Sequence, residues 1–225
     1  WPTLKLAQST RKKTLTTFFK THRCVRDDVI TKRINAIKQA MPLTEDLGVI
    51  APFERFIRVL IIQLRQVLIA IKEYDREIAK QFRAHSDYEI FDSLPGSGPV
   101  FGPRLLTAFG ANRDRFHHSD EMNCLSGVAP VVNRSGNYCW IHWRYSCPTF
   151  LRQTFVEWAR QTIRYSFWAK EFYDAKRKQG KSHQATLRAL AFKWIRIIFR
   201  CWKNKTPYDE SAYLFALKKR KTITD

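Results

Sequence analysis

The sequence is short of acidic residues, of paired cysteines and of long apolar runs, and each shortage excludes a class of protein. Its 20 Asp and Glu form no convincing cluster for two-metal phosphoryl transfer. The five cysteines are scattered without a CxxC pair, which argues against a zinc site or a disulfide framework. The most apolar stretch, residues 59–71, is too short and too polar to span a bilayer, and the N-terminus has no signal-peptide layout. We therefore expect a soluble, cytoplasmic protein with no membrane partner.

Basic residues are abundant instead. The chain has 40 Lys and Arg and a formal net charge of +20, yet it is 44% hydrophobic and 14% aromatic, as a folded protein is. A polyanion must neutralise such a charge, and nucleic acid is the commonest one; a membrane surface or an acidic protein is the alternative. Residues 131–205 carry +13 of the net charge and six of the seven tryptophans. Some of these could stack on bases, whereas we expect Trp158, Trp168 and Trp194 to fill a helical core.

Apolar spacing predicts a mainly α-helical protein. Residues 1–25 show weak periodicity and are expected to be loop or partner-dependent structure, followed by a helix over residues 26–41. A longer helix is expected over residues 52–82, because a seam of apolar residues recurs at alternating steps of three and four: Ile57, Leu60, Leu64, Val67, Ile71, Tyr74 and Ile78. This seam is typical of a coiled coil between subunits, and an intramolecular helical hairpin explains it equally well.

A compact helical domain should follow the coiled coil. We expect a helix-hairpin-helix-like element, a short β-hairpin around residues 131–144, and helices over 148–178 and 182–202, the last capped by Ser182. The tail from Asn204 should be basic and loose, with residues 213–217 helical. The expected divisions of the chain are residues 1–50, 51–86, 87–203 and 204–225.

Two stretches carry candidate chemistry. In the first, Gly96 and Gly98 open a helix whose free backbone N–H groups could hold a phosphate, helped by Arg104 and by two further arginines, Arg113 and Arg115. This is how a helix-hairpin-helix element grips a DNA backbone. A tight turn between packed helices is the competing interpretation.

In the second stretch, Ser135 lies between Arg134 and Gly136 at a strand end, where a ligand can approach the backbone closely. Its hydroxyl could attack a phosphodiester while Arg134 steadies the developing charge. Taken by residue type alone, an ordinary turn serine is the commoner case. Trp140 and Arg144 could contact DNA or RNA beside the serine. His142, expected on the same strand face as Trp140 and Arg144, is the candidate base nearest to Ser135 in sequence, although a structural histidine is the commoner case.

The order of these motifs resembles one family. The run LPGSGPVFGPRLLTAFG, then RF, then LSGVAPVVNRSG and basic helices resembles the C-terminal domain of the insertion-sequence transposases of the 110/116/902 group, the bridge-RNA-guided recombinases. The similarity covers residues 87–202, and the preceding coiled coil also lies where the family places one. The stretch after Ser-Gly, NYCWIHWRYSCPTFLRQ, departs from many relatives, so contacts there cannot be carried over.

The resemblance implies a function beyond what composition shows. Family members join an N-terminal RuvC-like domain with four metal-binding acidic residues to this domain, whose serine becomes linked to DNA; that serine corresponds to Ser135. The resemblance implies Mg²⁺ in the complete enzyme, a structured guide RNA, homo-oligomers assembled through the coiled coil, and a location at the bacterial or archaeal nucleoid. The acidic domain is missing from this sequence, which begins at Trp1, so we expect a fragment that is inactive alone and holds no metal itself.

Two other functions compete with this one. The chain could be a non-catalytic nucleic-acid-binding remnant or regulator derived from such a transposase. It could also be a structural coiled-coil assembly protein, although that leaves the basic region unexplained.

Overall fold

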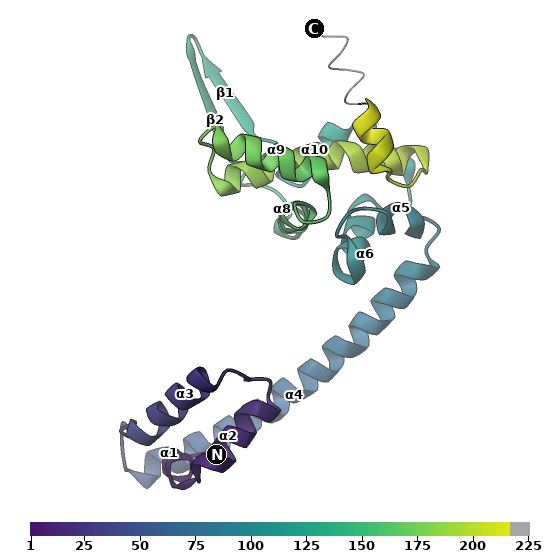
Figure 1. Ribbon diagram of the computed structural model, residues 1–225. Coiled ribbons are helices and arrows are strands. Elements are labelled where there is room, and N and C mark those ends of the chain that lie inside the picture. The colour runs from purple at the N-terminus through teal and green to yellow at the C-terminus, as the bar shows by residue number, and fades with distance from the viewer. Residues whose placement is uncertain (217–225) are drawn as a thin grey trace. The chain divides into compact units, whose positions relative to one another are not determined.

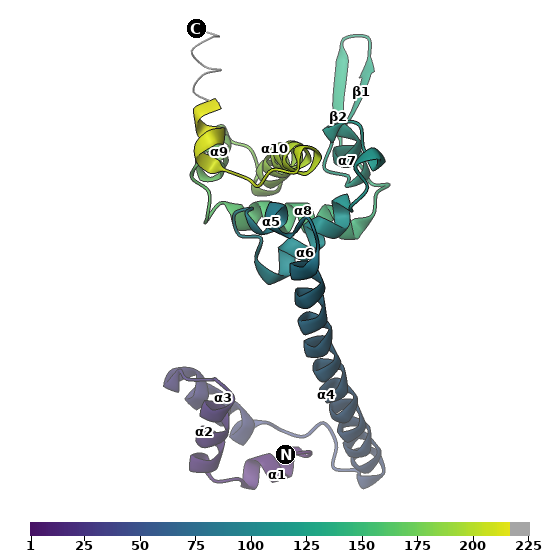
Figure 2. The same ribbon diagram turned by 90° about the vertical axis from the view of Figure 1, so that its right-hand side faces the viewer.

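The computed structural model describes residues 1–216, which are mainly helical with one antiparallel pair of strands (Figures 1 and 2). The expected fold class is therefore confirmed. The chain divides into two compact units, Trp1–Tyr74 and Asp75–Asp225, which are described separately below. Within the described part of the chain, no helix is long and apolar enough to cross a membrane.

The first unit is built from three short helices and most of a long one. Helices α1 (Leu4–Ser9) and α2 (Lys12–Thr21) occupy the segment that we expected to lack structure of its own, so that expectation was wrong. The reason is that α2 buries a single leucine, Leu15, against α3 (Asp27–Gln39), and one buried residue leaves little periodicity in the sequence. The amide of Gln8 also ties α1 to the end of α3 by donating to the carbonyl of Ala40 at 2.7 Å.

Helix α4 (Leu47–Ala84) confirms the expected long helix and begins five residues earlier than Pro52. Its start is stabilised by Asp46, whose Oδ1 accepts a hydrogen bond from the N–H of Gly48 at 2.8 Å. Every residue of the apolar seam is exposed, with exposed fractions between 42% for Ile57 and 70% for Tyr74. An intramolecular helical hairpin would have buried these side chains.

The second unit surrounds helix α10 (His183–Asn204). One face of α10 is completely buried, because Leu190, Trp194, Ile198 and Trp202 recur at helical spacing and all point into the core. Helices α7 (Ser119–Leu125), α8 (Thr149–Thr162) and α9 (Phe167–Lys178) pack against it. The core role expected for three tryptophans is confirmed, since Trp158, Trp168 and Trp194 are all buried and in ring contact.

The single helix expected over residues 148–178 was wrong, because the chain breaks between α8 and α9. The break is held by polar contacts to Ser166 and to a distant carboxylate. The Ser166 hydroxyl accepts from the N–H of Ala169, and the Glu210 carboxylate accepts from the N–H of Phe167 at 2.8 Å. A residue more than forty positions later therefore caps the start of α9, which local periodicity could not indicate.

The C-terminal segment is also better ordered than we expected. The Ser182 hydroxyl caps α10 as predicted, accepting from the N–H of Ala185. Beyond α10, however, the Tyr208 hydroxyl accepts from the indole of Trp168 at 2.8 Å and the Tyr208 N–H donates to Ser93 Oγ at 2.8 Å. Residues 210–216 are helical, whereas Leu217, the end of the expected helix, lies outside the described residues.

The remaining elements lie before α8. Helix α5 (Tyr88–Asp92) and helix α6 (Gly98–Phe109) are joined by a short turn, and the 3₁₀ helix η1 (Arg113–Arg115) precedes α7. Strands β1 (Val131–Ser135) and β2 (Tyr138–His142) form the expected hairpin, which projects from the helices of its unit in both views (Figures 1 and 2). Gly136 has a φ of +56° in the two-residue turn, which glycine adopts without strain.

Candidate nucleic-acid interface

The pairing register divides the hairpin into two faces. Ser135 pairs with Tyr138, Asn133 with Trp140 and Val131 with His142. Directly paired residues of antiparallel strands share a face, and alternate residues along a strand share it too. These six side chains therefore form one face, called here the serine face. Arg134 pairs with Cys139 on the opposite face.

The serine face combines a hydroxyl with an aromatic surface. The rings of Tyr138 and Trp140 stack with a centroid distance of 5.8 Å and an interplanar angle of 10°. Ser135, Tyr138 and Trp140 are all exposed, so neither the hydroxyl nor the ring faces are used in the core. Exposed flat rings beside polar groups are suited to stacking on nucleobases. Sequence reasoning selected Trp140 but missed Tyr138, which the two-residue spacing along a strand could have indicated.

The register separates Ser135 from Arg134, expected to stabilise charge, and from His142, the candidate base. Arg134 is its neighbour in sequence but lies on the opposite face of the hairpin. His142 shares the serine face, yet it is four residues along β2 from Tyr138, a distance of about 14 Å at 3.4 Å per residue. That is well beyond hydrogen-bond reach, so His142 cannot act directly as the base for Ser135. Gly136 contributes the turn itself, and a Cβ there would meet no atom within 4 Å.

The serine face continues into a hollow at the base of the hairpin, of about 360 Å³. Its lining includes three residues of the serine face and the segment that follows β2: Val131, Asn133, His142, Trp143, Arg144, Tyr145 and Ser146. We expected Arg144 on the strand with Trp140 and His142, but β2 ends at His142 and Arg144 lies beyond it. The Arg144 Nε is buried without a hydrogen-bond partner, and one terminal nitrogen lies 3.8 Å from Cys124 Sγ.

Two further arginines lie against the indole of Trp143. The guanidinium carbon of Arg188, from α10, is 4.0 Å from the ring centroid, and that of Arg152, from α8, is 4.8 Å away. None of Arg144, Arg152 and Arg188 has a carboxylate within 4.0 Å among residues 1–216. Burial lowers the pKa of Arg188, and the nearby charge of Arg152 lowers it further. Sequence reasoning missed this cluster, because its members are brought together from separate helices by tertiary packing.

The glycine turn before α6 is packed against α8. The Trp158 indole donates to the carbonyl of Pro95 at 3.1 Å, and a Cβ on Gly96 would lie 2.8 Å from the ring of Tyr165. Close packing, together with a φ of +68°, is therefore sufficient to explain Gly96. Gly98 begins α6 with a φ of +49° and open space around it. The following residue, Pro99, has no N–H to offer a phosphate.

The arginines near that turn are engaged with the protein to different degrees. Arg104 lies 3.9 Å from the Glu157 carboxylate and its guanidinium is 5.5 Å from the centroid of Phe150, although its side chain stays 37% exposed. Arg115 donates to the carbonyl of Ala108 and lies over the ring of Phe116. Their contacts are modest, so both retain charge at the surface.

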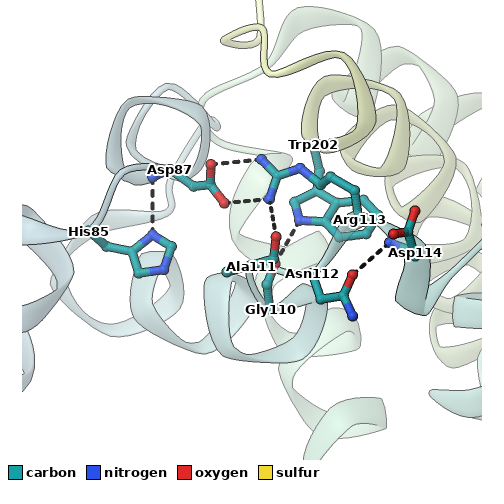
Figure 3. A network of polar contacts seen from close by, with 8 residues as sticks. All are labelled: His85, Asp87, Gly110, Ala111, Asn112, Arg113, Asp114 and Trp202. Carbon is teal, nitrogen blue, oxygen red and sulfur yellow. Dashed lines mark hydrogen bonds and ion pairs between the residues drawn. The ribbon is translucent and has the colours of Figure 1, made fainter.

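Arg113 instead belongs to a buried polar network (Figure 3). It donates two hydrogen bonds of 2.7 Å to the Asp87 carboxylate and lies 4.9 Å from the ring centroid of Trp202. The Trp202 indole in turn donates to the carbonyl of Gly110 at 2.7 Å. The bond from Arg113 lowers the pKa of Asp87. Because Asp87 already neutralises it, Arg113 is a structural residue and not a free phosphate ligand.

The described residues provide no metal centre of their own. No three His, Cys, Asp or Glu side chains in residues 1–216 lie close enough together to hold an ion. The serine face itself offers a hydroxyl, an amide, aromatic rings and the imidazole of His142, with guanidinium groups nearby.

Comparison with known proteins places the hairpin inside a transposase-like region. Residues 88–174 match the family described as Transposase IS116/IS110/IS902. A Streptomyces coelicolor protein named “Mini-circle putative transposase for IS117” is 28% identical over 170 residues, covering 76% of this chain and 40% of that protein. Two proteins named as uncharacterized insertion-element products are similar as well. The IS900 protein of Mycobacterium paratuberculosis is 29% identical over 63% of this chain and 36% of its own length, and the IS116 protein of Streptomyces clavuligerus is 29% identical over 80% and 44%.

These similarities support a relationship to insertion-sequence transposases. The chain spans about two fifths of the length of these relatives. The matched region includes α5, α6, the whole hairpin, α8 and part of α9.

Proposed function

We propose that this chain is part of a DNA transposase of the IS116/IS110/IS902 family, and that it supplies Ser135 as the nucleophile for DNA strand cleavage and exchange. One observation carries the proposal: within the region that matches the family, Ser135 stands at the exposed end of a projecting hairpin, beside stacked aromatic rings. A nucleophile for DNA must reach a phosphate that the duplex holds away from any protein core, and an exposed serine meets that requirement.

The chemical step is a phosphoryl transfer. The Ser135 oxygen attacks phosphorus, an Oγ–P bond forms, and the bond from phosphorus to one bridging sugar oxygen breaks. The serine proton passes to a base, and the departing sugar oxygen takes up a proton. Among the described residues, the register puts neither His142 nor Arg134 next to the hydroxyl. The base and the charge-stabilising groups therefore come from other parts of the assembly or from other subunits.

Mg²⁺ is part of this proposal only for the complete enzyme. The resemblance to the family is the support for this ion: it implies acidic residues of an N-terminal RuvC-like domain as the ligands, and we derive no step through it. A structured guide RNA that selects the DNA partners belongs to the same proposal. The surface basic residues, Arg104 and Arg134 among them, with the turn at Gly96 and Gly98, would contact the nucleic-acid backbone.

The exposed seam of α4 supports assembly into a homo-oligomer. Seven apolar side chains along one helical seam remain exposed, and pairing with the same seam of another subunit would bury them. A complete enzyme assembled in this way could combine an acidic centre and a serine from different subunits.

The decisive experiment is detection of a covalent protein–DNA adduct. The complete transposase, with its RNA, its DNA and Mg²⁺, should yield an adduct that survives denaturation, and peptide mapping should place the DNA on Ser135. Ser135→Ala should abolish it, whereas Ser211→Ala, which changes another exposed serine of the same unit outside the hairpin and the hollow, should retain it. An adduct of undiminished yield with Ser135→Ala would refute the assignment.

One alternative deserves a direct comparison, namely a non-catalytic nucleic-acid-binding remnant. It shares the basic surface and predicts the same salt-sensitive binding. It differs in predicting no adduct from any assembly that contains this chain.

A further inference from the structure

We propose that Trp143, Arg152 and Arg188, with Arg144, form a binding site for a backbone phosphate of the DNA strand that is presented to Ser135. This inference deepens the function proposed above and rests on it for the identity of the nucleic acid. The site lies at the base of the hairpin, next to the hollow that the serine face lines. We call it the indole–arginine site.

The geometry of the arginines indicates an anion. Arg152 and Arg188 approach the same indole at 4.8 Å and 4.0 Å, so both guanidinium groups are held by one ring. Their like charges repel each other, and cation–π contacts offset only part of that cost. Structural arginines are normally paired with a carboxylate, as Arg113 is with Asp87. A shared anion would remove the repulsion.

Arg144, which follows Trp143 and lines the adjoining hollow with it, adds an unused donor. Its Nε is buried and has no hydrogen-bond partner in the described structure, and its nearest acceptor contact is a thiol at 3.8 Å, a weak partner. A buried donor without a partner is unfavourable and calls for an acceptor. Its backbone carbonyl accepts from Arg152 at 3.1 Å, so the Arg152 side chain is anchored to the segment that carries Trp143 and Arg144.

The chemistry of the site fits a phosphodiester. Guanidinium groups match phosphate oxygens with two parallel hydrogen bonds, and they remain charged even where burial lowers their pKa. Trp143 keeps the two arginines in fixed positions, so little side-chain entropy is lost on binding. A single phosphate could accept from more than one of these arginines.

The distance to the serine fits a continuous strand of DNA. Along the hairpin, Ser135 is separated from the Val131–His142 pair by four residues, which is about 14 Å. At 3.4 Å per base pair along the duplex axis, this is the length of about four base pairs. A short stretch of duplex could therefore place one phosphate at Ser135 and another at the indole–arginine site, which would position the scissile phosphate.

The test is the salt dependence of DNA binding by the 225-residue chain. A fluorescent DNA duplex is titrated with protein at several salt concentrations, and the slope of log K against log salt is compared between variants. Arg152→Gln/Arg188→Gln should weaken binding about tenfold or more near 0.1 M salt and reduce the magnitude of the slope by about one, the change expected when the contact with one phosphate is lost. The matched control, Arg177→Gln/Lys178→Gln, removes the same charge from exposed positions of α9 and should change both quantities much less.

A second variant distinguishes loss of the phosphate contact from loss of the folded structure. Arg152→Lys/Arg188→Lys keeps both charges and should restore most of the slope, and circular dichroism should show the same helical content for every variant. Equal slopes for the two Gln double variants would overturn the proposal, because the loss would then reflect net charge alone. If the Arg152→Gln/Arg188→Gln variant changed the salt slope with an RNA duplex of the same sequence but not with DNA, the assignment to DNA would be overturned.

The outcome is separable from that of the adduct experiment. Ser135→Ala should leave the salt slope unchanged, since a neutral hydroxyl neutralises no phosphate charge and so releases no counterion from the DNA. If no adduct forms while the slope responds as expected, the nucleophile assignment fails and the phosphate site stands. If the adduct maps to Ser135 while the arginine substitutions leave the slope unchanged, the nucleophile assignment stands and the phosphate site fails.

Discussion

The buried pair of Asp87 and Arg113 leads to a quantitative prediction about stability. The Asp87 residue is 4% exposed and the Arg113 side chain 16%, and two hydrogen bonds of 2.7 Å join them. Asp87→Asn keeps the size of the side chain but removes its charge, which leaves the guanidinium desolvated and unpaired. Breaking a buried pair from one side costs about 3–5 kcal/mol. Since Arg113 keeps some access to water, we expect a value of about 3 kcal/mol.

Thermal unfolding measures this effect. For a chain of this size each kcal/mol lowers the midpoint by about 2–4 °C, so Asp87→Asn should lower it by about 6–12 °C at neutral pH. Arg113→Met with Asp87→Asn completes a double-mutant cycle, in which the double variant should lose less than the sum of the single variants. A loss below about 0.5 kcal/mol for Asp87→Asn, or strictly additive losses, would refute the reasoning.

The same pair makes stability depend on pH in a defined direction. Arg113 lowers the pKa of Asp87 in the folded protein below its value of about 3.9 in the unfolded chain. A lowered carboxyl pKa contributes stability above the unfolded value, and that stability is lost as the pH falls through the folded value. The difference between the wild-type chain and Asp87→Asn should therefore be full at pH 7 and shrink below about pH 4. Denaturant unfolding at several pH values measures it.

Two further predictions concern packing and capping. Gly127→Ala should be strongly destabilising, by about 2–4 kcal/mol, because the new Cβ would lie 2.3 Å from the Cys147 sulfur at a φ of +69°. Gly180→Ala is the control: its φ of +78° is as unfavourable but the space is open, so only the backbone cost of about 1–2 kcal/mol should appear. Equal losses would mean that the steric contact does not matter. Glu210→Ala should cost about 1–2 kcal/mol, since it removes the acceptor for the Phe167 N–H at the start of α9; an unchanged unfolding midpoint would show that water replaces the carboxylate.

The elements that could be predicted from the sequence are those specified by local pattern. The long helix α4, the cap at Ser182 and the hairpin of β1 and β2 each depend on residues close together in the chain, and each was found as expected, α4 with an earlier start. The break between α8 and α9 could not be predicted, because Glu210, which holds it, is far away in sequence. Helix α2 was missed because a single buried residue, Leu15, gives no periodic signal.

The candidate site also contains residues that local sequence pattern predicts and residues that only tertiary packing brings together. Ser135 and its neighbours on β1 and β2 follow from the strand pattern, although the pairing register was needed to show that Arg134 faces away and that Tyr138 faces the serine. Arg152 and Arg188 could not be assigned to a site from the sequence, since the packing of α8 against α10 brings them to one indole. The function of an arginine depends on its partner, and partners come from tertiary structure.

The anchoring of Trp202 has a consequence for synthesis of the protein on the ribosome. Its indole bonds to Gly110, and Lys203 bonds to the carbonyl of Arg113, so the last turns of α10 close contacts with residues made about ninety positions earlier. Until α10 has left the exit tunnel, apolar side chains of residues 87–116 such as Phe109 and Phe116 therefore lack their contact with Trp202. A nascent chain released before that point would expose this surface to chaperones and proteases, so only polypeptides translated past α10 would accumulate.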